Sequence, residues 1–178
     1  MKPSFKKSEL SFLISPSHTI SSFVKYLKAT IENILGHSFE DRFFKAHISL
    51  MKDNEHTEDY LYDIDSKMRA FRPFTVSVKN FNVFRHGSHK RTIYLEIVNK
   101  TALCEIFETL KGKNISFTPH ITIAKNLYIT DFTKVWNYLK DLSYSNDFLC
   151  DRITVLKRLG HRWIHHTDIP FTDITFNY

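Results

Sequence analysis

The chain has 178 residues, of which 42% are hydrophobic and 15% aromatic, so it can bury a complete core. Charged residues make up 25% of the chain, and there are only four glycines and five prolines. This composition excludes a long disordered tract, a collagen-like segment and a flexible linker. The formal net charge of +6 and a pI near 9.2 favour a polyanionic partner over a polycationic one.

The two cysteines and the N-terminal sequence indicate the cellular compartment in which the protein is expected. Cys104 and Cys150 stand in neither a C-x-x-C pair nor a Cys/His ligand spacing, so a disulfide framework is not expected. The apolar run at residues 12–14 is too short for a signal peptide, and no stretch is long enough to cross a bilayer. We therefore expect a cytoplasmic protein that does not contact a membrane.

Hydrophobic periodicity predicts alternating strands and helices in the first part of the chain. The clearest element is a long amphipathic helix at residues 19–35, which Ser17 or His18 would cap and Gly36 would close. In chain order, the predicted elements are a strand at 10–15, the helix at 19–35, a strand at 44–51 and a helix at 58–71.

The second part of the chain is richer in strand patterns, and a polar turn at residues 85–89 predicts a hairpin. The remaining predicted elements are strands at 74–84 and 92–98, a helix at 102–111, a strand at 117–124, a helix at 131–142, and a closing strand pair at 148–156 and 162–171. This order predicts an α+β or α/β fold with helices packed on mixed or antiparallel sheets.

Two segments of the chain repeat each other. Residues 44–50 (FKAHISL) and 117–123 (FTPHITI) share three identical positions and two conservative ones, and an amphipathic helix follows each after a polar stretch. The repeat favours an internal duplication that produces two lobes related by an approximate two-fold axis. We expect residues 1–178 to form a single bilobal domain.

The repeated segments place the same chemistry on one face of each strand. Side chains alternate along a strand, so His47 and Ser49 share one face, as do His120 and Thr122, whereas the residues between them suit an apolar core. Cleavage of a phosphodiester needs one group that accepts a proton and another that donates one, and imidazoles with a pKa near 6.5 can do both. Hydroxyl groups can donate hydrogen bonds to the non-bridging phosphate oxygens.

The bare H-x-S/T pattern is weak, because it occurs four times in a chain with ten histidines. A single copy is most simply a structural histidine beside a hydroxyl group. The copy at His86 lies in a turn and the copy at His165 has no partner repeat, whereas those at His47 and His120 share a preceding phenylalanine and following aliphatic residues. The duplication therefore favours a functional interpretation.

Metal binding by the histidines is the competing interpretation. His161, His165 and His166 are further candidate ligands, but no His-Glu-x-x-His motif or paired Cys/His spacing occurs. We expect these three residues to be surface or hairpin residues, and we expect neither a metal site nor a cofactor.

The segment 116–125 (SFTPHITIAK) resembles the two-histidine (2H) phosphoesterases, which include bacterial 2′-5′ RNA ligase-like proteins and cyclic nucleotide phosphodiesterases. The order of elements resembles that family over nearly the whole chain. The resemblance implies a bilobal fold with a central cleft lined by both motifs, and a reaction at a 2′,3′-cyclic or 2′-5′ phosphodiester. Such proteins often carry an arginine where this chain has Lys125, so the charge is kept and the bidentate fork is lost.

The resemblance implies an enzyme that needs no metal, with His47, Ser49, His120 and Thr122 as its catalytic residues and RNA or a nucleotide as its substrate. Lys125, Arg85, Phe84 and Lys45 are predicted to bind the substrate, with Tyr94 as a further candidate, because aromatic and basic side chains together hold single strands. We expect a monomer. A catalytically idle RNA- or nucleotide-binding module with the same cleft, or a plain interaction domain, remain the alternatives.

Overall fold

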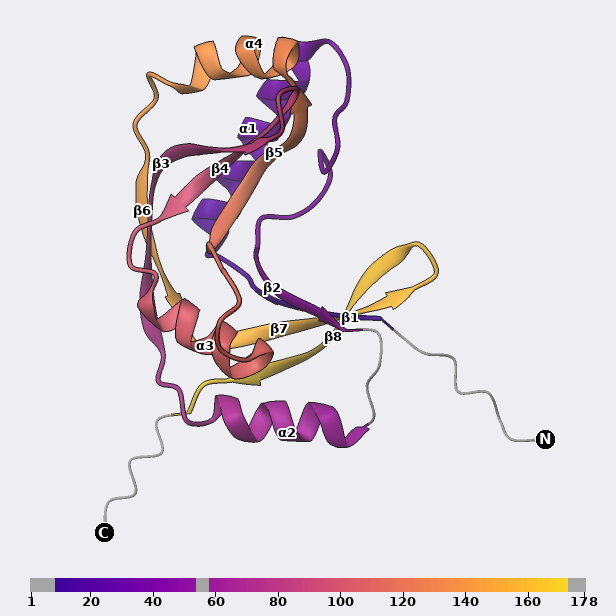
Figure 1. The fold of residues 1–178 in the computed structure, drawn as a ribbon, viewed down its shortest axis with the longest axis vertical. Coiled ribbons are helices and arrows are strands. Elements are labelled where there is room, and N and C mark those ends of the chain that lie inside the picture. The colour runs from indigo at the N-terminus through magenta and orange to yellow at the C-terminus, as the bar shows by residue number, and fades with distance from the viewer. Residues whose placement is uncertain (1–8, 54–57, 173–178) are drawn as a thin grey trace, which may run out of the picture.

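The computed structural model describes residues 9–53 and 58–172, which form a mixed α+β fold with two four-stranded antiparallel sheets (Figure 1). The elements in chain order are β1 Leu10–Ile14, α1 His18–Leu35, β2 Ile48–Asp53, α2 Glu58–Met68, β3 Phe74–His86, β4 Lys90–Ile97, α3 Thr101–Lys111, β5 His120–Tyr128, α4 Ile129–Leu139, β6 Ser145–Cys150, β7 Arg152–Leu159 and β8 Arg162–Pro170. The predicted fold class is confirmed.

The two sheets have the same internal plan. One sheet, called sheet A here, has the order β2-β1-β7-β8, and the other, sheet B, has the order β5-β4-β3-β6. In each sheet an edge strand that carries a histidine motif pairs with the strand that precedes it, and a helix connects the two. Strand β2 is therefore the counterpart of β5, and the two edge strands contact each other.

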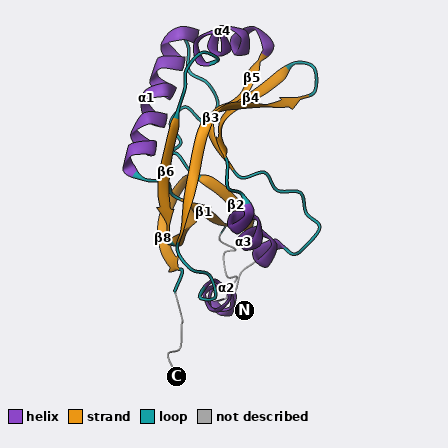
Figure 2. Ribbon diagram, turned by 90° about the vertical axis from the view of Figure 1, so that its left-hand side faces the viewer, coloured by secondary structure: helices purple, strands orange, loops and turns teal. Residues whose placement is uncertain are grey.

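The connecting helices cross between the sheets. Helix α1 joins two strands of sheet A but contacts β5 and α4, whereas α3 joins two strands of sheet B but contacts β2 and α2. Figure 2 shows α1 and α4 beside sheet B, and α2 and α3 at the opposite end of the molecule. The hydrophobic core is correspondingly continuous and draws on both sheets.

Helix α1 follows its sequence signals closely. The Ser17 side chain accepts a hydrogen bond from the Ile20 backbone N–H, and Gly36 ends the helix with φ +75° in the left-handed region, as the sequence predicts. The buried stripe consists of Ile20, Val24, Leu27, Lys28, Ile31 and Leu35. A lysine within this stripe is unusual, because a buried ammonium group needs hydrogen-bond partners. Among the described residues, no helix has the length and apolar character that a membrane span requires.

Several predicted boundaries were wrong. The strand predicted at 44–51 begins at Ile48, because the preceding residues form a loop in which the Phe44 carbonyl accepts a hydrogen bond from Lys28 of α1. The helix predicted at 58–71 ends at Met68, and the strand predicted at 117–124 runs from His120 to Tyr128.

The largest error concerns the strand predicted at 148–156. The chain crosses there from sheet B to sheet A, so β6 ends at Cys150 and β7 begins at Arg152. Buried residues lie at even positions before the crossing (Phe148, Cys150) and at odd positions after it (Ile153, Val155). A shift in phase of this kind marks a break between two strands.

Candidate active site

His47 and His120 occupy equivalent positions at the start of the two edge strands. His47 Nδ1 lies 2.8 Å from the carbonyl oxygen of Lys45, and His120 Nδ1 lies 2.7 Å from that of Thr118. A carbonyl oxygen can only accept a hydrogen bond, so Nδ1 is the donor in both rings. In each neutral imidazole Nε2 therefore carries the lone pair, and no described residue occupies it.

The hydroxyl groups predicted to hold phosphate are free to do so. Ser49 is exposed and Thr122 is half-buried, whereas Ile48 and Ile121 are fully buried on the opposite face of their strands. Neither hydroxyl makes a hydrogen bond to another residue within the described chain. Each strand thus presents an imidazole and an uncommitted hydroxyl on one face, as strand alternation predicts.

The two imidazoles share an electrostatic environment. Burial lowers the pKa of His47, and burial also lowers the pKa of His120. The charge of His47 lowers the pKa of His120 further. The two rings therefore interact through space, and the second proton binds less readily than the first.

A bulge in each edge strand adds a lysine to the same face. Pairing skips one residue between Ser49 and Met51 in β2, and one residue between Thr122 and Ala124 in β5. An extra residue reverses the alternation of side chains between the two faces of the strand. Two consecutive residues are therefore buried in each strand, and the side chain after them lies on the same face as the histidine. These side chains are Lys52 and Lys125, each five positions after its histidine.

Lys125 also helps to connect the two edge strands. Its ammonium group lies 2.9 Å from a carboxylate oxygen of Glu40, and its backbone N–H donates a 3.1 Å hydrogen bond to Asp41 Oδ1. Glu40 and Asp41 lie in the loop between α1 and β2, the loop that leads into His47. These two bonds connect the loop that precedes His47 to β5, the strand that carries His120.

A buried ion pair supports this loop from the side of α1. Lys28, only 2% exposed, donates to Asp41 Oδ2 at 2.9 Å, to the Asp41 carbonyl at 2.7 Å and to the Phe44 carbonyl at 3.2 Å. Desolvation lowers the pKa of Lys28 and raises the pKa of Asp41. Sequence reasoning missed both residues, although a lysine inside the apolar stripe of α1 was a usable signal.

Aromatic side chains surround His120. The rings of Phe84 and Tyr94 stack with centroids 4.1 Å apart, and both meet the His120 ring edge to face, at 4.9 Å and 5.3 Å. The structure thus brings Phe84 and Tyr94, both named from the sequence, to the second histidine. These contacts fix the orientation of the imidazole and provide an aromatic wall beside it.

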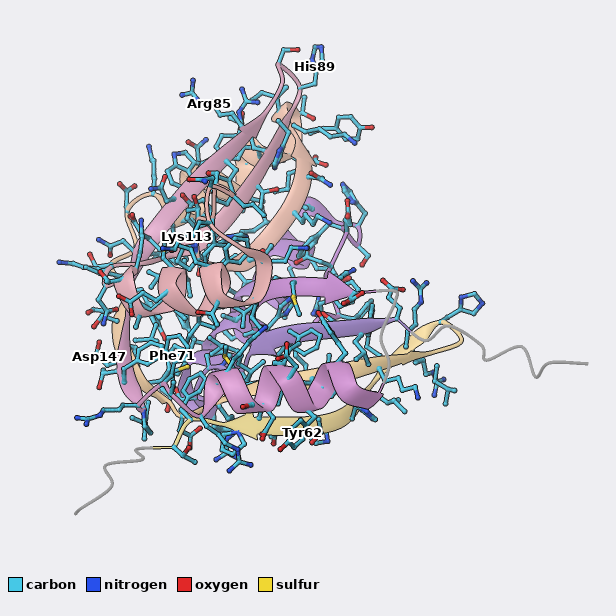
Figure 3. All side chains as sticks on the ribbon, turned by 60° about the horizontal axis from the view of Figure 1, so that its bottom comes forward. Tyr62, Phe71, Arg85, His89, Lys113 and Asp147 are labelled. Atoms are coloured by element: carbon cyan, nitrogen blue, oxygen red, sulfur yellow. The ribbon has the colours of Figure 1, made fainter. Side chains whose placement is uncertain are left out.

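The remaining predicted site residues lie differently. Lys45 is exposed, and its contribution to the geometry is the carbonyl group that orients His47. Arg85 alternates with Phe84 along β3, pairs with Arg91, and lies near the outer end of the β3–β4 hairpin, as Figure 3 shows. Alternation directs Arg85 to the face of β3 opposite Phe84, and therefore away from the aromatic rings beside His120.

The other histidine patterns have local partners. His86 Nε2 lies 2.9 Å from the Thr92 hydroxyl, and His165 Nε2 lies 3.1 Å from an Asp168 carboxylate oxygen. Within the described residues, no three His, Cys, Asp or Glu side chains gather closely enough to hold a metal ion. An open depression of about 710 Å³ lies between residues 86–90 and 128–130, and none of its lining residues belongs to either motif.

Comparison with known sequences identifies related proteins. A family model described as the 2′-5′ RNA ligase superfamily matches residues 30–162, a span that contains both histidine motifs. BH1439 of Halalkalibacterium halodurans, provisionally named a phosphoesterase, is 27% identical over 125 residues, which cover 65% of this chain and 72% of that protein.

Solved structures share the fold. TT0787 of Thermus thermophilus aligns with a TM-score of 0.65 and 13% identity over 92% of this chain and 97% of its own. Escherichia coli LigT in complex with 3′-AMP aligns with a TM-score of 0.63 and 13% identity over 93% of this chain and 98% of its own. LigT has also been solved with phosphate bound.

Proposed function

Because the chain belongs to the 2′-5′ RNA ligase superfamily and is thus a phosphoesterase of the two-histidine kind, we propose that it cleaves or transfers a 2′,3′-cyclic or 2′-5′ phosphodiester of RNA or a nucleotide. His47 and His120 act as general acid and general base, and no metal takes part. The observation that carries this proposal is the matched pair of strands. Each presents a histidine with Nδ1 bonded to a carbonyl, a free hydroxyl and a lysine.

The fixed tautomer suits proton transfer at Nε2. The neutral histidine takes a proton from the attacking water or ribose hydroxyl as the new P–O bond forms. The protonated histidine gives its Nε2 proton to the ester oxygen that leaves as the old P–O bond breaks. The carbonyl group behind each Nδ1 keeps the ring in place through both protonation states, because Nδ1 carries a hydrogen in each.

The hydroxyl and lysine side chains on the same strand faces as the two histidines would bind the phosphate. Ser49 and Thr122 donate hydrogen bonds to the non-bridging oxygens, and Lys125 supplies positive charge. Lys45, exposed two residues before His47, adds charge at the approach to the site. Phe84 offers an aromatic edge for a base near His120.

We infer that residues 1–178 work as a single bilobal domain, with the cleft between the histidine faces of the two sheets. The crossed helices support this, since α1 packs on the strand of the second motif and α3 on that of the first. The continuous core supports it as well. LigT, which shares the fold, has been solved with nucleotide ligands, in keeping with a nucleotide-type substrate.

The decisive experiment measures turnover of 2′,3′-cyclic mononucleotides and 2′-5′-linked dinucleotides by chelator-treated protein. His47→Ala and His120→Ala should each reduce kcat by about 10²- to 10⁴-fold, the usual worth of one proton-transfer group. Thermal unfolding checks that the variants remain folded. Wild-type turnover in both folded variants, or activity that chelation abolishes and a divalent metal restores, would refute the proposal. Binding without turnover by the wild-type protein would favour the idle module instead.

A further inference from the structure

Lys52 differs from its counterpart Lys125 in what surrounds it. Both side chains return to the histidine face after a bulge, but Lys125 is paired with Glu40, whereas Lys52 has no ion pair with any described residue. Lys52 instead lies over the ring of Trp163, with its ammonium nitrogen 5.2 Å from the ring centroid. A cation that no described carboxylate neutralises, on the same face as His47 and Ser49, is available to an anion.

The contact between Lys52 and Trp163 spans the open face of sheet A. Lys52 lies on β2 and Trp163 on β8, which are the two outer strands of the sheet, so the side chains meet above β1 and β7. Trp163 is half-buried and pairs with Arg158 on β7, whose guanidinium carbon lies 5.9 Å from the same ring. The hairpin of β7 and β8, yellow in Figure 1, extends beyond the other strands of sheet A.

The two cations beside Trp163 are held differently. Arg158 is fixed, because it donates to Glu9 Oε2 at 2.8 Å and to the Gly160 carbonyl at 3.2 Å. Lys52 has a flexible stem and no such partner in the part of the chain that the structure describes, so its ammonium group can move from the ring to a phosphate. It also acts on His47 at a distance, since its charge contributes to the lowered pKa of that residue.

We propose that Lys52 and Trp163 form a second subsite, in which a nucleotide next to the reacting phosphodiester stacks its base on Trp163 and places its phosphate against Lys52. Aromatic stacking beside a basic groove is how single strands are held, and every base offers a face to the ring. The occupant is a single-stranded oligonucleotide. The inference rests on the proposed function, because it assumes that the reacting phosphodiester lies at the two histidines.

The kinetic test compares two substrates that share a reacting group. One is a mononucleoside 2′,3′-cyclic phosphate, and the other is a trinucleotide that ends in a 2′,3′-cyclic phosphate. Trp163→Ala should reduce the ratio of kcat/KM for the trinucleotide to that for the mononucleotide by roughly 5- to 150-fold, the usual cost of losing one stacked base. Lys52→Ala should also reduce this ratio. Trp163→Phe, which keeps an aromatic ring, should give a ratio close to that of the wild-type protein.

Arg162→Ala is the matched control, because Arg162 is an exposed cation of the same hairpin that alternates to the other face of β8. It should leave the ratio unchanged. Equal losses on both substrates, or an equal effect of Arg162→Ala, would overturn the subsite.

A binding test separates failure of the subsite from failure of the proposed reaction. The chain has two tryptophans, so Trp163 is the only one in a Trp136→Phe variant. A single-stranded 2′-O-methyl oligonucleotide, which cannot react through its 2′ oxygens, should change the Trp163 fluorescence saturably, with a weaker Kd after Lys52→Ala. This result would support the subsite even if neither substrate were turned over. An unchanged signal, or equally tight binding of duplex RNA, would overturn it.

Discussion

Replacement of Lys28 by methionine tests whether the buried ion pair positions the loop that leads into His47. Methionine has a similar length and suits the apolar stripe of α1, so the change removes the charge and its hydrogen bonds with little loss of packing. The Asp41 carboxylate, whose side chain is 9% exposed, would keep only the hydrogen bond from the Lys125 N–H. The Phe44 carbonyl would lose its bond from Lys28, and the Asp41 carbonyl would keep only the bond from the Phe44 backbone N–H.

The expected loss of stability is large. Removing one partner of a buried pair typically costs about 3–5 kcal/mol, because the other charge stays buried without compensation. For a protein of this size, each kcal/mol lowers the melting temperature by roughly 2–4 °C, so Lys28→Met should lower it by roughly 6–20 °C. The kcat should fall as well, since Lys28 holds the Phe44 carbonyl three residues before His47.

The assay is urea unfolding, with Lys25→Met as the matched control from an exposed position of the same helix. The double variant Lys28→Met/Asp41→Asn should recover much of the loss. Asparagine tolerates the φ of +65° at this position, keeps an acceptor for the Lys125 N–H, and leaves no buried charge. A Lys28→Met variant as stable as the control, or a double variant less stable than the single one, would refute this reasoning.

Three further predictions concern activity. Because burial lowers the pKa of both His47 and His120, the maximum of the bell-shaped profile of kcat/KM against pH should lie below pH 6.5. The negative charge of a bound phosphate should move the corresponding kcat profile to higher pH. Coincident profiles centred above pH 7 would contradict this prediction. Lys125→Ala should raise KM more than it lowers kcat, and Lys125→Arg should lower KM for substrates with a terminal phosphate, as initial rates would show. Phe84→Ala should raise KM several-fold, because Phe84 contacts the His120 ring, whereas Arg85→Ala should leave KM unchanged. Equal increases in KM for the two variants would place both side chains at the site.

The sequence predicts most of the fold because its strongest signals are local. The helix α1 has a cap at Ser17, an apolar stripe and a closing Gly36, and all three appear in the structure. The errors fall where the cause is not local. The loop before His47 looks like a strand by composition, but Lys28 bonds to its carbonyl groups instead of a neighbouring strand.

The bulges explain why the sequence locates the histidines and hydroxyl groups but not the lysines. Simple alternation places His47 and Ser49 on one face and would send Lys52 to the other. In each edge strand, one unpaired residue between the hydroxyl residue and the lysine reverses that assignment, and this irregularity depends on pairing with β1 and β4 rather than on the strand itself. Resemblance to a family indicated Lys125, whereas nothing in the first motif alone indicated Lys52.

Symmetry of the two motifs raises the question of how an asymmetric substrate is oriented. A phosphodiester has one attacking and one leaving oxygen, but the two histidines have the same tautomer, the same neighbouring hydroxyl and the same direction of pKa shift. Nothing within the motifs distinguishes acid from base. The surroundings do, since His120 is enclosed by Phe84 and Tyr94, whereas His47 lies near the charges of Lys28, Asp41 and Lys52. The groups beside the motifs, rather than the motifs, must therefore fix the direction in which the substrate binds, and with it the role of each imidazole.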